Sequence, residues 1–140
     1  MKSRPFSLQD LEHHELQSSR TGEKYSLSAV LTQVLGFKDV FVHHDMIPPG
    51  RRASGAHAHS EREEMVVVLE GAVTATLGGE SHFLEAGDFI GFPPGGENTH
   101  FIRNEGTETA RILVIASNPS SDAVLMDDST CPILSKSKDG

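Results

Sequence analysis

Residues 50–71 read GRRASGAHAHSEREEMVVVLEG, and the rest of the chain can be interpreted outward from them. The stretch places a His-x-His pair, His57 and His59, ahead of two adjacent glutamates and ends in Gly71. Alternate residues of an extended strand share a face, so the two imidazoles would point the same way with Cα atoms about 6.6 Å apart. Two imidazoles in that arrangement can bind one metal ion.

The residue types narrow the metal to the transition series. Imidazole nitrogen suits zinc, iron, nickel and copper, and a glutamate oxygen is compatible with iron, manganese or zinc. We therefore expect a divalent transition metal (zinc, iron, manganese or nickel) as cofactor. Calcium is disfavoured because it takes oxygen ligands only. Since the chain has eight histidines, a chance His-x-His pair on a solvated strand or loop is the competing interpretation.

A second stretch supplies a third histidine. Residues 87–104 read GDFIGFPPGGENTHFIRN, in which the Pro93-Pro94-Gly95-Gly96 turn precedes a short strand over residues 99–103 that carries His100. A histidine on a separate strand could complete a metal site with the first pair.

Together the two stretches resemble the paired motifs of the cupin superfamily. Gly50, His57, His59, Glu64 and Gly71 match the first motif, with six residues rather than five between Gly50 and His57. The second motif is matched by Gly87, Pro93, Gly95, His100 and Asn104. Four residues instead of two separate Gly95 from His100, which lengthens the turn. The resemblance spans roughly residues 40–116.

The resemblance implies an all-β fold, an antiparallel β-barrel of the jelly-roll or double-stranded β-helix type, with a metal bound inside by His57, His59, Glu64 and His100. Glu63 is the rival carboxylate. The family's spacing to Gly71 favours Glu64, and strand alternation puts Glu64 on the face of Val66 and Val68. The sequence alone leaves open which face points inward.

A closer similarity exists to small, single-domain bacterial cupins of the conserved-barrel type, most of which lack an assigned reaction. It rests on residues 43–52, on His57-Ala58 and on Gly91-Phe92-Pro93. Several of those relatives have Glu where this chain has His59, so His59 favours a working metal site here.

Length and composition fit one soluble domain. The chain has 140 residues, 36% hydrophobic and 23% charged, and shows no membrane span or signal peptide, so we expect a cytoplasmic protein. Its net charge of −8 and lack of a basic stripe argue against nucleic acid as a partner. The single cysteine, Cys131, excludes an internal disulfide.

Short strand signals recur between turns, as antiparallel barrels require. We expect an N-terminal arm over residues 1–24, a barrel over 25–118 and a tail over 119–140 that packs partly on it. The first strand is predicted over Tyr25 to Leu35 and the second over Val40 to Ile47, where one of His43 and His44 would face the barrel as a pocket-lining residue.

Within the strand predicted over residues 64–70, residues 65–69 are apolar on both faces, which indicates burial on both sides. The outer side needs a cover: a second sheet, the N-terminal arm or a second copy of the chain. Because symmetric pairing is the commonest soluble assembly and cupins often form dimers, we expect a homodimer.

Three functional hypotheses follow. The chain is a metal-dependent enzyme acting on a small polar molecule such as an organic acid or sugar, with the reaction open among oxygenase, isomerase, decarboxylase and hydrolase. Alternatively, it is a small-molecule binding or sensing module without turnover, or a structural cupin whose histidines only line a polar cavity.

Overall fold

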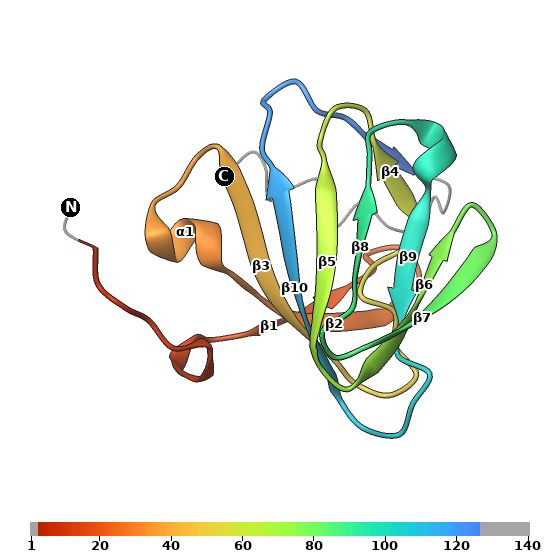
Figure 1. The fold of residues 1–140 in the computed structure, drawn as a ribbon, viewed down its shortest axis with the longest axis horizontal. Helices are drawn as coiled ribbons and strands as arrows, with labels where there is room; N and C mark the ends of the chain where they lie inside the picture. The colour runs from red at the N-terminus through yellow and green to blue at the C-terminus, as the bar shows by residue number, and fades with distance from the viewer. Residues whose placement is uncertain (1–2, 127–140) are drawn as a thin grey trace.

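Two antiparallel sheets enclose a common apolar core in the computed structural model, which describes residues 3–126 (Figure 1). The larger sheet has the strand order β1 (His14–Gln17), β2 (Lys24–Val30), β3 (Val40–Ile47), β10 (Ala110–Ser117), β5 (Glu64–Glu70) and β8 (Phe89–Phe92). The smaller sheet has the order β11 (Val124–Met126), β4 (His57–His59), β9 (His100–Arg103), β6 (Ala72–Leu77) and β7 (Glu80–Glu85). The expected all-β barrel is confirmed.

Strand alternation builds the core. In β5, Val66 and Val68 are buried while Met65 and Val67 are only partly covered. The smaller sheet contributes Val73, Ala75 and Ile102 to the same cluster. Residues two apart share a face of a strand, so Glu64 lies on the same inward face as Val66. The sequence alone did not determine which face of this strand points into the barrel, and the structure shows that it is the face of Glu64.

The predicted strand over Tyr25 to Leu35 is wrong in its second half. Strand β2 ends at Val30, and Leu31–Leu35 form the short helix α1, which lies beside β3 (Figure 1). The Thr32 hydroxyl accepts a hydrogen bond from the backbone N–H of Val42 at 2.6 Å and donates to the carbonyl of Val40 at 2.9 Å. Gly36 ends the helix with φ +72°, a conformation that glycine adopts without strain. These contacts override the strand propensity of the segment.

The N-terminal segment joins the larger sheet instead of only lying over it. Residues Leu8–Asp10 form a 3-10 turn capped by Ser7, and β1 pairs with β2 at the sheet edge. The expectation for the tail can be followed only as far as Met126, where β11 pairs with β4. Cys131 and the rest of the tail lie outside the described residues.

Asn104, the last matched residue of the second motif, is a structural clamp. Its buried side chain donates to the carbonyls of Ile47 at 2.7 Å and Glu108 at 2.8 Å and accepts from the N–H of Gly106 at 2.9 Å. One side chain thus fastens the end of β3 to the turn between β9 and β10.

Candidate metal centre

Three strands bring the predicted ligands together. His57 and His59 form the two ends of β4, Glu64 is the first residue of β5, and His100 is the first residue of β9. His57 and His100 face each other directly in the register of β4 and β9. All four side chains are buried, as the barrel interior requires.

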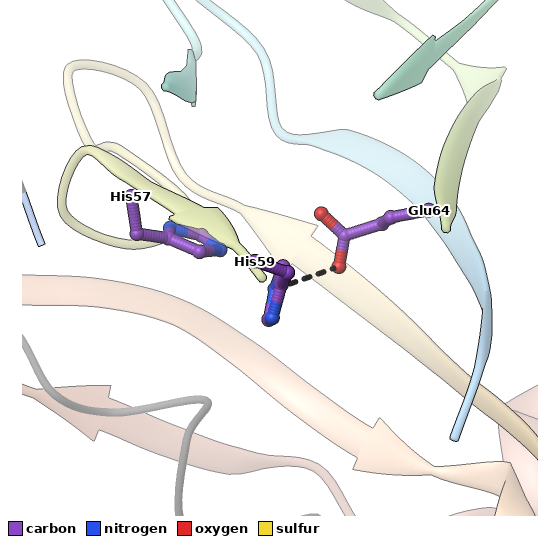
Figure 2. Close-up of side chains that lie close together, drawn as sticks. All are labelled: His57, His59 and Glu64. Atoms are coloured by element: carbon purple, nitrogen blue, oxygen red, sulfur yellow. Dashed lines mark ion pairs between the residues drawn. The ribbon is translucent and has the colours of Figure 1, made fainter. Parts of the chain in front are cut away.

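Three of the four residues form a cluster that could hold a metal ion (Figure 2). His57, His59 and Glu64 each offer one ligand atom, and these atoms all lie within 4.8 Å of one another. The closest ion pair in the cluster joins His59 Nε2 to Glu64 Oε2 at 3.8 Å. In Figure 2 the Glu64 carboxylate extends toward the two imidazoles of β4.

His100 reaches the cluster through Glu64. Its Nε2 lies 2.9 Å from Glu64 Oε1, and its ring centroid lies 4.8 Å from that of His57. Phe92 stacks on its other side with ring centroids 3.6 Å apart and planes 2° from parallel. The two extra residues between Gly95 and His100 are taken up by the 3-10 turn Gly96–Asn98, which leaves His100 opposite His57.

A second set of hydrogen bonds fixes the tautomer of each histidine. The Nδ1 of His57 donates to the carbonyl of Gly55 at 2.9 Å, and the Nδ1 of His100 donates to the carbonyl of Asn98, also at 2.9 Å. His59 Nδ1 donates to Asp122 Oδ2 at 2.8 Å. Because the Nδ1 atoms of His57 and His59 are engaged, their Nε2 atoms are left to face the barrel interior with a lone pair, as metal-binding histidines do. The Nε2 of His100 instead hydrogen-bonds Glu64 Oε1 and would have to give up the proton of that bond to bind a metal.

The atoms at the centre of the cluster lack other partners. Within residues 3–126, the buried His57 Nε2, His59 Nε2 and Glu64 Oε2 have no hydrogen-bond partner. Unsatisfied buried polar atoms are costly, and three of them converging on one point need an explanation. A divalent transition metal supplies it, because imidazole nitrogens and a carboxylate oxygen are ligands that such ions accept.

The electrostatics keep His57 and Glu64 in their metal-binding forms. Burial lowers the pKa of His57 to about 4, so its imidazole is neutral at pH 7. Burial acts to raise the pKa of Glu64, but opposing effects, of which the hydrogen bond from His100 is the largest, outweigh it and hold the pKa well below its usual range. The carboxylate is therefore ionised.

Glu63 and Glu64 are clearly distinguished. Glu64 is 6% exposed and belongs to the cluster, whereas Glu63 is exposed and its backbone N–H bonds the hydroxyl of Ser117. The preference for Glu64 that spacing and alternation gave agrees with this arrangement.

The expectation that one of His43 and His44 faces the barrel is confirmed. His43 lines the small cavity beside His57, Glu64 and His100. His44 points to the opposite side of β3, where its Nδ1 lies 2.7 Å from His13 Nε2. Although it faces away from the barrel, His44 is fully buried by the N-terminal segment.

Sequence reasoning missed two acidic residues of the site. Asp122 hydrogen-bonds His59 although it lies 63 positions away in the chain, and no local sequence pattern predicts that contact. Asp45 hydrogen-bonds His43 at 2.8 Å, and both residues are buried. The signal for Asp45 was present, because His43 and Asp45 are two apart on one strand and must share a face.

Comparison with known proteins identifies the class. The family model for the cupin domain matches residues 43–116, more than half of the chain, so this protein belongs to the cupin family. No curated protein matches the sequence significantly.

Among solved structures, a protein from Acidithiobacillus ferrooxidans, provisionally described as a sugar phosphate isomerase, is 29% identical. The match covers 89% of this chain and 81% of that one, with a TM-score of 0.77. A sugar phosphate isomerase of the cupin superfamily from Silicibacter pomeroyi is 24% identical over 89% and 82% of the two chains, with a TM-score of 0.78. A Thermotoga maritima protein described as a predicted oxalate decarboxylase is 21% identical over 81% and 98%, with a TM-score of 0.69. The last two similarities support the fold alone.

Proposed function

We propose that this cupin binds one divalent transition metal through His57, His59, Glu64 and His100 and acts there on a small polar molecule, an organic acid or a sugar. The observation that carries the proposal is the common orientation of the three imidazoles. Each has its Nδ1 engaged by a protein acceptor and its Nε2 directed inward, beside an ionised carboxylate.

The residues of the proposed site have different roles. The two imidazoles of β4 and the carboxylate of Glu64 supply ligand atoms from opposite walls of the barrel, and Asp122 holds the ring of His59 in place. Phe92 stacks on His100 and restricts how its ring can turn. A metal held there would act as a Lewis acid or redox centre toward a bound molecule.

Among the reaction classes, isomerisation of a sugar phosphate has the most direct support. The relative from Acidithiobacillus ferrooxidans carries that provisional description at 29% identity, and its match covers most of both chains. Aldose–ketose isomerisation requires a polarised carbonyl and a group that moves a proton, and a metal inside the barrel would provide the first. A non-catalytic binding or sensing role is the alternative.

The test begins with elemental analysis of protein purified without an affinity tag. Wild type should hold about one transition metal per chain, and the double variant His57→Ala, His100→Ala should hold none. The matched control is His14→Ala, His82→Ala, because both of those imidazoles lie at least partly exposed outside the site. A wild-type protein that takes up no supplied metal would overturn the proposal.

A substrate screen then separates enzyme from binding module. Metal-loaded wild type is incubated with aldose and ketose phosphates and with small organic acids, and products are followed by NMR. Turnover that disappears in the His57→Ala, His100→Ala variant supports an enzyme. Ligand-induced stabilisation without turnover across the panel supports the binding module instead.

We also propose that the chain forms a homodimer through the outer face of the larger sheet. Val67 on β5 lies between Leu113 on β10 and Phe89 on β8, so these three apolar side chains form one row. Phe89 is 69% exposed and Leu69 is 42% exposed. Light scattering should give a dimer mass for wild type and a monomer mass for Phe89→Glu; a wild-type monomer would contradict the proposal.

For the described residues, no helix has the length and apolar character that crossing a membrane would need.

A further inference from the structure

His43 occupies a distinctive position in the barrel. It lies on the inward face of β3, is only 1% exposed, and lines a cavity of about 20 Å³ together with Asp45, His57, Glu64 and His100. A cavity of that size has room for about one water molecule or a comparably small ligand atom. His43 belongs to none of the three strands that carry the predicted metal ligands.

One ring nitrogen of His43, Nδ1, is hydrogen-bonded, and the other, Nε2, is not. Its Nδ1 donates to Asp45 Oδ1 at 2.8 Å, and Asp45 itself is only 2% exposed. Phe41 lies against the imidazole with ring centroids 5.3 Å apart. Within residues 3–126, His43 Nε2 is buried without a hydrogen-bond partner.

A buried imidazole in that state is costly unless something else completes its hydrogen bonding. Burial acts to lower the pKa of His43, but the charge and hydrogen bond of Asp45 and the charge of Glu64 raise it overall. In either protonation state Nε2 can hydrogen-bond an oxygen or an anion of a bound molecule: it donates to an anion or carboxylate oxygen when both ring nitrogens carry protons, and it accepts from a hydroxyl group when only Nδ1 does.

We propose that His43 Nε2 is the protein's contact to the small molecule that binds beside the metal, with Asp45 as its positioning residue. The inference rests on the proposed metal site and adds the group that recognises the molecule bound there. The class of ligand is a small anion or a carboxylate or hydroxyl oxygen. Such a contact would also let a proton pass between Nε2 and the bound molecule.

Anion binding to cobalt-loaded protein tests the proposal, with azide as the probe and the visible cobalt spectrum as the readout. Wild type is compared with His43→Leu, which removes the hydrogen bond, and with His43→Gln, whose side-chain amide keeps a donor. The control is His14→Leu, an exposed histidine. All proteins are first checked for cobalt content and for cooperative thermal unfolding.

We expect His43→Leu to bind azide about 10-fold or more weakly than wild type, because a hydrogen bond to a charged group is lost. His43→Gln should recover most of that affinity, and His14→Leu should match wild type. Equal azide affinity in wild type and His43→Leu would overturn the inference, and so would a cobalt-loaded wild type that binds no azide.

Loss of cobalt from both His43 variants would also overturn the inference, because it would make His43 a metal ligand. If His43→Leu alone fails to fold, His43→Gln is compared with wild type instead. The azide affinity of His43→Gln should differ from that of wild type by less than about 3-fold. Complete loss of azide binding in His43→Gln would contradict the donor role. A wild type that takes up no cobalt would instead overturn the proposed function, and the elemental analysis identifies that case separately.

Discussion

His59 Nδ1 lies 2.8 Å from Asp122 Oδ2, although the two residues are 63 positions apart in the chain. The other carboxylate oxygen, Oδ1, accepts the backbone N–H groups of Glu61 at 2.8 Å and Arg62 at 2.9 Å. One buried carboxylate therefore orients a predicted metal ligand and fixes the loop that leads from β4 to Glu64. The segment after β10 is part of the site because it carries this residue.

Replacing Asp122 by asparagine should weaken metal binding by about 10- to 100-fold, as loss of such outer partners does. The amide can keep the loop contacts through its oxygen, but its NH₂ group would face His59 Nδ1. The imidazole would then favour the tautomer that carries its proton on Nε2, where the metal should bind. Competition with a chromophoric chelator gives the affinity.

The control for that prediction is Asp10→Asn, which changes an exposed carboxylate far from the cluster. Unchanged metal affinity in Asp122→Asn would show that the orientation of His59 does not depend on Asp122.

Glu64→Gln should abolish stoichiometric metal binding, whereas Glu63→Gln should leave it intact. Both changes remove one negative charge at adjacent positions, but only Glu64 belongs to the cluster and is ionised there. The metal content of the two purified variants checks the prediction. Equal loss in both would mean that net charge in this region, not ligation, controls metal uptake.

Asn104→Ala should lower the free energy of unfolding by about 3 kcal/mol, since it leaves the buried carbonyl of Ile47 and the part-buried backbone groups of Glu108 and Gly106 without their side-chain partner. Urea denaturation measures the change. Asn98→Ala is the matched control, because its amide makes one long contact of 3.4 Å to Pro94 and should cost less than about 1 kcal/mol. Similar costs for both variants would contradict the clamp role of Asn104.

Acid should destabilise the metal-free protein partly through His44. Burial, with the charge of Arg111, lowers the pKa of His44 to about 4 from an ordinary 6.5. As pH falls below 6.5, His44 binds a proton in the unfolded chain but not in the folded chain. The free energy of unfolding therefore decreases down to about pH 4 and then levels off. His44 alone contributes up to about 3 kcal/mol to this loss.

Urea denaturation of wild type and His44→Gln at several pH values tests the contribution of His44 to acid destabilisation. The slope of stability against pH between 6.5 and 4 should be shallower in His44→Gln, with the remainder due in part to His57, whose pKa is also lowered to about 4. His14→Gln should retain the full wild-type slope, because that side chain is exposed. An identical slope in His44→Gln would contradict the assignment.

Much of the site could be predicted because its signals are local. Strand alternation places His57 and His59 on one face and groups Glu64 with Val66, and both follow from the two-residue period of a strand. Glycine at position 71 marks the turn between β5 and β6, where φ is +76° and a Cβ would lie 3.2 Å from Ala110 Cα. Alternation and turn chemistry depend only on neighbouring residues, so the sequence alone determined them.

The tertiary structure decided what depends on contacts between distant segments. The pairing of His57 with His100, the hydrogen bond from His59 to Asp122 and the position of His43 in one cavity with Glu64 are set by how strands from distant parts of the chain pair and pack. Helix α1 likewise forms because Thr32 bonds to β3, against the strand propensity of its own residues. Local preferences are worth at most about 1 kcal/mol per residue, and long-range hydrogen bonds and burial outweigh them.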